Sequence, residues 1–267
     1  MKKTISAIFA VAALTISAIA SDLTMTFSVE QKRRPASKGK QHIEQNFQTA
    51  RFSRTNNGST RIDLLTDHTN SVAYQINHKK KTIQKIYRDD TKAQIELIRA
   101  GIEDGYLSDA AFVRAINRIF GNITEADIVL VRDGTETVAN VEHERWKLSV
   151  GKVIYHIIAD PSISRPRPID GGGLIALLGM SPRTEGIFNK FAAEFLKIEG
   201  VPLRMEVHIM GRTVTYEVIS IDDSPIPESV FELPSSYQVE DVGKIRLQRL
   251  EAAVEKRKQR NQKKQKR

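Results

Sequence analysis

The segment IPESVFELPSSYQ, at residues 226–238, is the stretch of sequence that best indicates the fold, and we call it the closing segment. It shows neither helical nor strand periodicity. Pro225 and Pro227 lack the amide hydrogen that a central strand needs, whereas Phe231 and Leu233 are large apolar side chains that require burial. We therefore predict that the closing segment crosses an open sheet edge with Phe231 as its anchor. An ordinary loop with one buried aromatic is the alternative.

The residues before the closing segment mainly show the alternation of apolar and polar side chains that is typical of strands. This alternation covers residues 23–88, 126–159 and 202–221. Two turn signals within the later regions are Asp133-Gly134 and Met210-Gly211. Strands that follow one another with turns between them favour an antiparallel sheet over alternating strand–helix units.

Two regions interrupt the strands with an apolar period of three to four residues. In residues 91–120 this period predicts two short helices, the second capped by Ser108 or Asp109. A second helical insertion is predicted within residues 174–198. Its first part, 174–180, fits either a glycine-hinged lid over a cavity or a buried helical turn. The expected fold class is therefore α+β and mainly antiparallel.

The first 20 residues have the three regions of a secretory signal peptide in the required order: a basic start, a short apolar stretch and small residues before the cleavage site. Cleavage between Ala20 and Ser21 is expected, and no later stretch approaches the length of a membrane span. The chain has no cysteine, which excludes disulfides, zinc–thiolate sites and lipid attachment at cysteine. We expect a non-lipidated periplasmic or secreted protein with one domain at residues 21–240.

The basic tail, residues 241–267, contains the segment that accounts for the net charge of the protein. Residues 244–267 contain eleven basic and two acidic residues, which equals the net charge of +9 of the full chain. A short apolar stripe in its first half fits a helix or a coiled coil, and its end fits a disordered polycation. We expect the tail to be dispensable for folding and to bind anionic membrane surfaces or envelope polymers rather than nucleic acid.

The polar residues show no catalytic or metal-binding signature. The six histidines have no ligand spacing such as His-x-His or His-Glu-x-x-His. The neighbouring acids Asp89-Asp90 and Asp222-Asp223 would face opposite ways on a strand, so they are poor acid/base pairs. The sequence predicts no enzyme, no cofactor and no metal.

A family resemblance rests on the hairpin before the closing segment and on the closing segment itself. The matching residues are Gly200, Pro202, Leu203, Pro227, Phe231, Pro234 and Tyr237. Together with the stretch AYQINHKKKT at residues 73–82, they resemble a secreted bacterial domain of unknown function in the LolA/LolB-like group of outer-membrane lipoprotein carriers. Asn77 stands where that group more often has Asp. The resemblance implies a curved, unclosed antiparallel sheet with helices on its concave side.

The resemblance also implies a function, because relatives of that shape hold acyl chains or apolar peptides. We expect an apolar cavity between the sheet and the helices at 91–120 and 185–198. Its candidate lining residues are Phe47, Tyr74, Phe112, Trp146, Phe191, Phe195, Met205 and Val207. The expected function is a non-enzymatic binding protein for a lipid or lipoprotein acyl chain. The alternative is a structural or interaction protein of the cell envelope with a filled core, in which Trp146 is core filler.

Overall fold

The fold is one large antiparallel sheet that curves without closing. The computed structural model describes residues 22–32, 39–58, 60–138, 140–163 and 181–265, so the expected signal peptide, Ser21 and the stretch 174–180 lie outside the described residues. The sheet has the order β12-β6-β5-β4-β3-β2-β1-β11-β10-β9-β8-β7. Its strands are β1 (Leu23–Lys32), β2 (Lys40–Gln48), β3 (Phe52–Asn57), β4 (Ile62–Asp67), β5 (Val72–Asn77), β6 (Thr82–Tyr87), β7 (Ile128–Val138), β8 (Val141–Val150), β9 (Val153–Asp160), β10 (Val201–Ile209), β11 (Arg212–Asp222) and β12 (Gln238–Asp241). Among these described strands, only the β12–β6 pair is parallel. The predicted fold class is confirmed.

The two turn signals have different outcomes. Met210 and Gly211 both have positive φ and form the tight turn between β10 and β11, as predicted. Asp133-Gly134 is not a turn: it is a bulge inside β7, where the register with β8 shifts between Arg132 and Thr135 and Gly134 has a φ of +94°. The prediction of a turn there was wrong because a bulge needs the same left-handed glycine that a turn needs.

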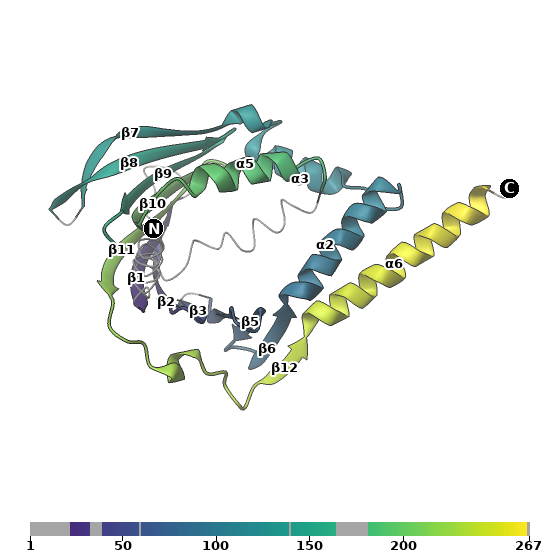
Figure 1. Ribbon diagram of the computed structural model, residues 1–267, viewed down its shortest axis with the longest axis horizontal. Helices are drawn as coiled ribbons and strands as arrows, with labels where there is room; N and C mark the ends of the chain where they lie inside the picture. Colours follow the sequence, from purple (N-terminus) through teal and green to yellow (C-terminus); the bar gives the residue numbers. More distant parts are fainter. Residues whose placement is uncertain (1–21, 33–38, 59, 139, 164–180, 266–267) are drawn as a thin grey trace, which may run out of the picture.

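The α-helices of the described residues lie at the inside and at the opening of the curved sheet. They are α2 (Arg88–Glu103), α3 (Ala110–Phe120), α5 (Glu185–Phe195) and α6 (Val242–Gln265). Helices α3 and α5 cover the inner face of β7–β9, while α2 spans the open side between the two ends of the sheet and α6 runs beside it (Figure 1). An ion pair of 2.9 Å between Arg99 and Glu185 links α2 to α5.

The sheet is apolar on opposite faces in its two halves. In β8, β9 and β10 the apolar side chains point inward and form one core with α3 and α5; its fully buried members include Leu148 and Ile157. In β3–β6 they point outward and form a second core, which includes Leu65 and Ile76. The strand registers show which side chains lie on the same face, because directly paired residues of an antiparallel sheet share a face.

The closing segment covers the second core on the outer face (Figure 1). Phe231 is 7% exposed and stacks on Phe52 with 5.1 Å between ring centroids. The Tyr237 hydroxyl lies 3.1 Å from His78 Nδ1. The segment then continues as β12, which pairs with β6 and occupies the end of the sheet. It therefore lies across a sheet face as well as along an edge.

The basic tail is helical, as its apolar stripe indicated, but it packs on the rest of the chain, whereas we expected it to be dispensable for folding. The α6 side chain Val254 is 4% exposed, and Gln94 of α2 donates a 3.1 Å hydrogen bond to the Gly243 carbonyl. Near the other end, Arg257 donates to the Tyr106 carbonyl. The apolar stripe of the tail thus pairs with α2 of the same chain, and we now expect removal of α6 to destabilise the protein.

Candidate functional site

The space between the sheet and helices α3 and α5 is filled by side chains. An apolar gap of only about 10 Å³ is present there, which is about the minimum that holds one water molecule. It is lined by Ile116, Phe120, Ile123, Val150, Tyr155, Ile187 and Phe191. The rings of Tyr155 and Phe191 pack against each other with 5.8 Å between their centroids. Between the sheet and these two helices, aromatic side chains of the two layers are in contact and leave only this small gap for the predicted cavity.

The eight predicted lining residues do not form one group. Six of them pack around the inner core: Phe112, Trp146, Phe191, Phe195, Met205 and Val207. Phe47 and Tyr74 belong to the second core, under the closing segment on the outer face. Their assignment to the inner face was wrong because alternation shows which residues of a strand share a face but does not say which face is concave.

A larger pocket lies beside the helix-covered core, on the inner face of β1, β2, β10 and β11. Its volume is about 250 Å³, just below the range of about 300–1,000 Å³ that is typical of small-molecule sites. It is lined by Met25, Phe27, Glu44, Asn46, Gln48, Pro202, Met205 and Tyr216. We call it the inner pocket.

The strand registers explain why the inner pocket has an apolar and a polar side. Met25 pairs with Asn46 and Phe27 with Glu44 across β1 and β2, and Met205 pairs with Tyr216 across β10 and β11. Strands β1, β10 and β11 therefore supply apolar side chains, while β2 turns its polar set inward because Phe47 occupies the outer core. The pocket lies at the boundary where the apolar face of the sheet changes sides.

The polar side of the inner pocket is held by hydrogen bonds within the sheet. The Glu44 carboxylate accepts a 2.5 Å hydrogen bond from Asn57 Nδ2, and its Oε1 lies 3.0 Å from His42 Nε2. The Asn46 Oδ1 atom is buried and has no hydrogen-bond partner in the described part of the chain. Burial, followed by the negative charge of Glu44, raises the pKa of the Tyr216 hydroxyl, which keeps it neutral.

Sequence reasoning found only one residue of the inner pocket, Met205. The alternation of Leu23, Met25 and Phe27 in β1 is visible in the sequence and could have identified this apolar row. The polar row of β2 carried no such signal, because Glu44, Asn46 and Gln48 read as the solvent-facing side of an amphipathic strand.

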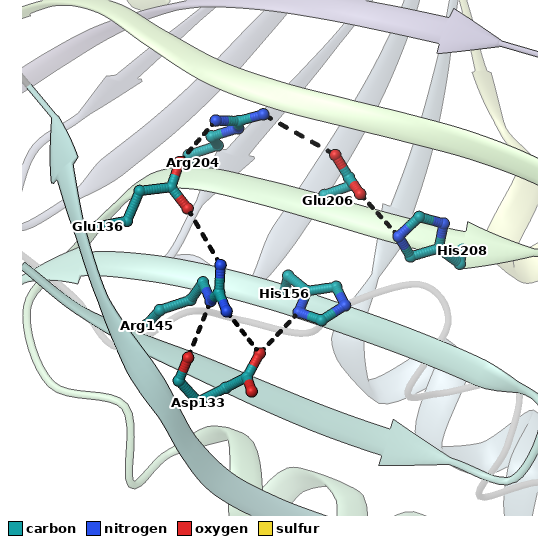
Figure 2. A network of polar contacts seen from close by, with 7 residues as sticks. All are labelled: Asp133, Glu136, Arg145, His156, Arg204, Glu206 and His208. Atoms are coloured by element: carbon teal, nitrogen blue, oxygen red, sulfur yellow. Dashed lines mark hydrogen bonds and ion pairs between the residues drawn. The ribbon is translucent and has the colours of Figure 1, made fainter. Parts of the chain in front are cut away.

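A polar network occupies the outer face of β7–β10, behind the inner core (Figure 2). Glu136 accepts from Arg204 at 2.8 Å and lies 3.7 Å from Arg145. The bulge in β7 turns the Asp133 carboxylate to Arg145, at 3.1 Å, and to His156 Nδ1, at 3.5 Å. Further members are Glu206 and His208, whose side chains are 2.7 Å apart. This network surrounds an open hollow of about 250 Å³.

The network contains a histidine with a shifted pKa. Burial, followed by the nearby His208, lowers the pKa of His156 below its ordinary value of 6.5. The other charged groups around it are Asp133 and Glu206, which act in the opposite direction, and Arg145, which adds to the shift. Lys147 is its directly paired neighbour on β8. His156 is therefore neutral in the folded protein at neutral pH.

We predict that His156 reduces stability in acid. The pKa of His156 is lower in the folded protein than in the unfolded chain, so the unfolded chain takes up the proton first as the pH falls. The contribution of neutral His156 to the free energy of unfolding is therefore complete above pH 6.5 and decreases as the pH falls from 6.5 toward the folded pKa. Chemical denaturation of His156→Gln across this interval should show a smaller loss than the parent protein. His68→Gln, a histidine outside the network, serves as the control. An unchanged pH profile in His156→Gln would contradict the prediction.

No group of metal-binding residues appears in the described part of the chain. Its His, Asp and Glu side chains form no cluster of three that could hold a metal ion. No helix among the described residues is both long and apolar enough to cross a membrane.

Comparisons with known proteins give fold similarities only. No family model matches the sequence, and no curated protein matches it. The chain is similar to an uncharacterized conserved protein from Thermus thermophilus, with 8% identity over 86% of this chain and 99% of the other and a TM-score of 0.44. It is similar to a LolA superfamily protein from Nitrosomonas europaea, with 10% identity, coverages of 80% and 91% and a TM-score of 0.32. A third similarity is to the Pseudomonas aeruginosa MucA/MucB complex structure, with 9% identity, coverages of 86% and 62% and a TM-score of 0.40.

These solved structures thus include a member of the LolA superfamily, the group that the sequence motifs resemble. The unclosed curved sheet is the architecture that this resemblance implied. Identities and TM-scores of this size carry no conclusion on ligand, partner or activity, because one fold hosts many functions.

Proposed function

We propose that this chain is a non-enzymatic binding protein of the periplasm or cell exterior that holds an apolar group, such as a lipid acyl chain, in the inner pocket. The observation that carries the proposal is the pocket itself, a hollow of about 250 Å³ whose lining includes Met25, Phe27, Met205 and Tyr216. Well-packed interiors leave few voids larger than a water molecule, and an apolar hollow of this size suits one chain end rather than a whole lipid.

The envelope-structural alternative rests on the filled core between the sheet and α3 and α5. The inner pocket favours the binding role, because a purely structural sheet has no use for an apolar hollow beside a closed core. The signal peptide expected at residues 1–20 supports placement outside the cytoplasm.

The test is binding of a neutral apolar fluorophore, 1-N-phenylnaphthylamine, followed by displacement with a medium-chain lipid. We expect saturable 1:1 binding by the parent protein. Met205→Trp should reduce it at least tenfold, because the indole ring fills the pocket. Met210→Trp is the matched control, since Met210 lies in the next turn and is 55% exposed. If the parent protein gives no saturable binding, or if both variants bind like the parent, the inner pocket is not a binding site.

We further propose that the basic face of α6 brings the protein to anionic surfaces. Lys256, Arg260 and Lys263 are exposed on α6, and each basic residue near an anionic bilayer contributes about 1 kcal/mol. Charge reversal of these three to Glu should abolish sedimentation with phosphatidylglycerol vesicles. Reversal of three exposed lysines elsewhere provides the control: Lys40 at the start of β2, and Lys79 and Lys80 in the turn between β5 and β6. If added salt leaves vesicle binding unchanged, the basic face of α6 is not the binding surface.

A further inference from the structure

The lining side chains of the inner pocket include one carboxylate, that of Glu44, and no cationic group in the described chain. The polar side of the pocket consists of Glu44, Asn46 and Gln48 on β2. Glu44 is an acceptor that Asn57 and His42 already hold in place. A bound molecule therefore meets a fixed carboxylate beside the apolar side chains.

One acceptor of this polar side is unused. The Asn46 Oδ1 atom is buried without a partner in the described part of the chain, and a buried carbonyl oxygen without a hydrogen bond destabilises the fold. Asn46 pairs with Met25 in the strand register, so its amide stands directly beside the apolar wall. Asn46 lines the pocket, so a rotation of its amide would bring this oxygen to a donor group attached to an apolar chain in the pocket.

An apolar chain that ends in a free carboxylate would bind less well in this pocket. It carries no donor for Asn46 Oδ1, and its charge would be close to the Glu44 carboxylate in a partly desolvated site, where like charges repel more strongly than in water. After burial, the Glu44 charge is the second cause that raises the pKa of the Tyr216 hydroxyl on β11.

We infer that the inner pocket selects apolar chains whose adjoining polar group is a hydrogen-bond donor, such as a hydroxyl, an amide N–H or an ammonium group, and excludes free fatty acids. This inference rests on the proposed function, because it names the ligand class of the same pocket. Asn46 accepts from the donor, Glu44 excludes anions, and Met25, Phe27 and Met205 contact the chain.

The experiment is displacement of 1-N-phenylnaphthylamine by three ligands of one chain length at neutral pH: decanamide, decanol and decanoate. We expect decanamide and decanol to act at concentrations at least about tenfold lower than decanoate, the ratio that one hydrogen bond and one repulsion produce. Glu44→Gln should bring decanoate close to decanol. Asn46→Leu should weaken displacement by decanamide and by decanol and leave displacement by decanoate unchanged.

The matched control is Glu217→Gln, since Glu217 neighbours Tyr216 on β11, pairs with Ser28 on the opposite face of the sheet and is exposed. It should keep the parent selectivity. Decanoate that displaces the fluorophore as well as decanamide from the parent protein would overturn the inference and leave the proposed function standing. A fluorophore that never binds would overturn both.

Discussion

Phe231→Ala is expected to lower the free energy of unfolding by roughly 3–5 kcal/mol, the range for deleting a buried phenylalanine side chain. Phe231 is 7% exposed and stacks on Phe52, and it lies over Leu65, Ile76 and Ile83, which are 0–2% exposed. Removal of the ring would leave a cavity and uncover this outer core. Because Phe231 is the most deeply buried residue of the closing segment, the loss should also loosen β12.

Equilibrium denaturation in urea measures this effect, with Val239→Ala as the control. Val239 lies in β12 and is 54% exposed, so its truncation should change stability by less than about 0.5 kcal/mol. A change of under about 1 kcal/mol in Phe231→Ala would show that the closing segment is a surface loop and does not hold the outer core.

Arg54→Met is expected to cost about 3 kcal/mol, at the lower end of the range for removing one partner of a buried ion pair. Arg54 Nη2 lies 2.6 Å from Asp63 Oδ2, and the two side chains are 12% and 9% exposed. Arg54 Nη1 also donates a 2.6 Å hydrogen bond to the Val230 carbonyl of the closing segment. The variant leaves Asp63 with His78 as its remaining partner, at 2.9 Å, which limits the loss.

Arg51→Met provides a matched comparison on the same part of the sheet. Arg51 pairs with Asp67 at 3.2 Å, but its side chain is 55% exposed, so this pair should contribute about 0–1 kcal/mol. Thermal and urea unfolding of the two variants should therefore differ by about 2 kcal/mol. Equal losses would mean that the contact between Arg54 and the closing segment does not stabilise the protein.

A comparison of Phe231→Ala with Met205→Trp asks whether the stability of the outer core and ligand binding in the inner pocket depend on each other. The outer core occupies one face of β3–β6, whereas the pocket lies on the other face of β1, β2, β10 and β11. Strand β2 belongs to both, since Phe47 faces the outer core and Glu44 and Asn46 face the pocket. We expect Phe231→Ala to weaken ligand binding only through stability, and Met205→Trp to weaken binding with little effect on stability.

Local sequence patterns determined most of the elements of this protein. Alternation located the strands, a three-to-four period located α2, α3 and α5, and the prolines around Phe231 indicated a segment that covers the sheet. Met210-Gly211 formed its turn because two adjacent residues with positive φ suffice for one. These features depend on the backbone preferences and side-chain periods of neighbouring residues, which a sequence displays directly.

Only the tertiary structure decided which face each apolar row would use. Phe47 and Tyr74 have the same alternation as Trp146 and Met205, yet the first pair lies under the closing segment and the second pair with α3 and α5. The tail likewise has the composition of a free polycation, yet in the fold Val254 is buried and α6 packs beside α2. The physical reason is the same in each case: a period of two or of 3.6 residues sorts side chains into faces, whereas the partner that buries a face comes from distant parts of the chain.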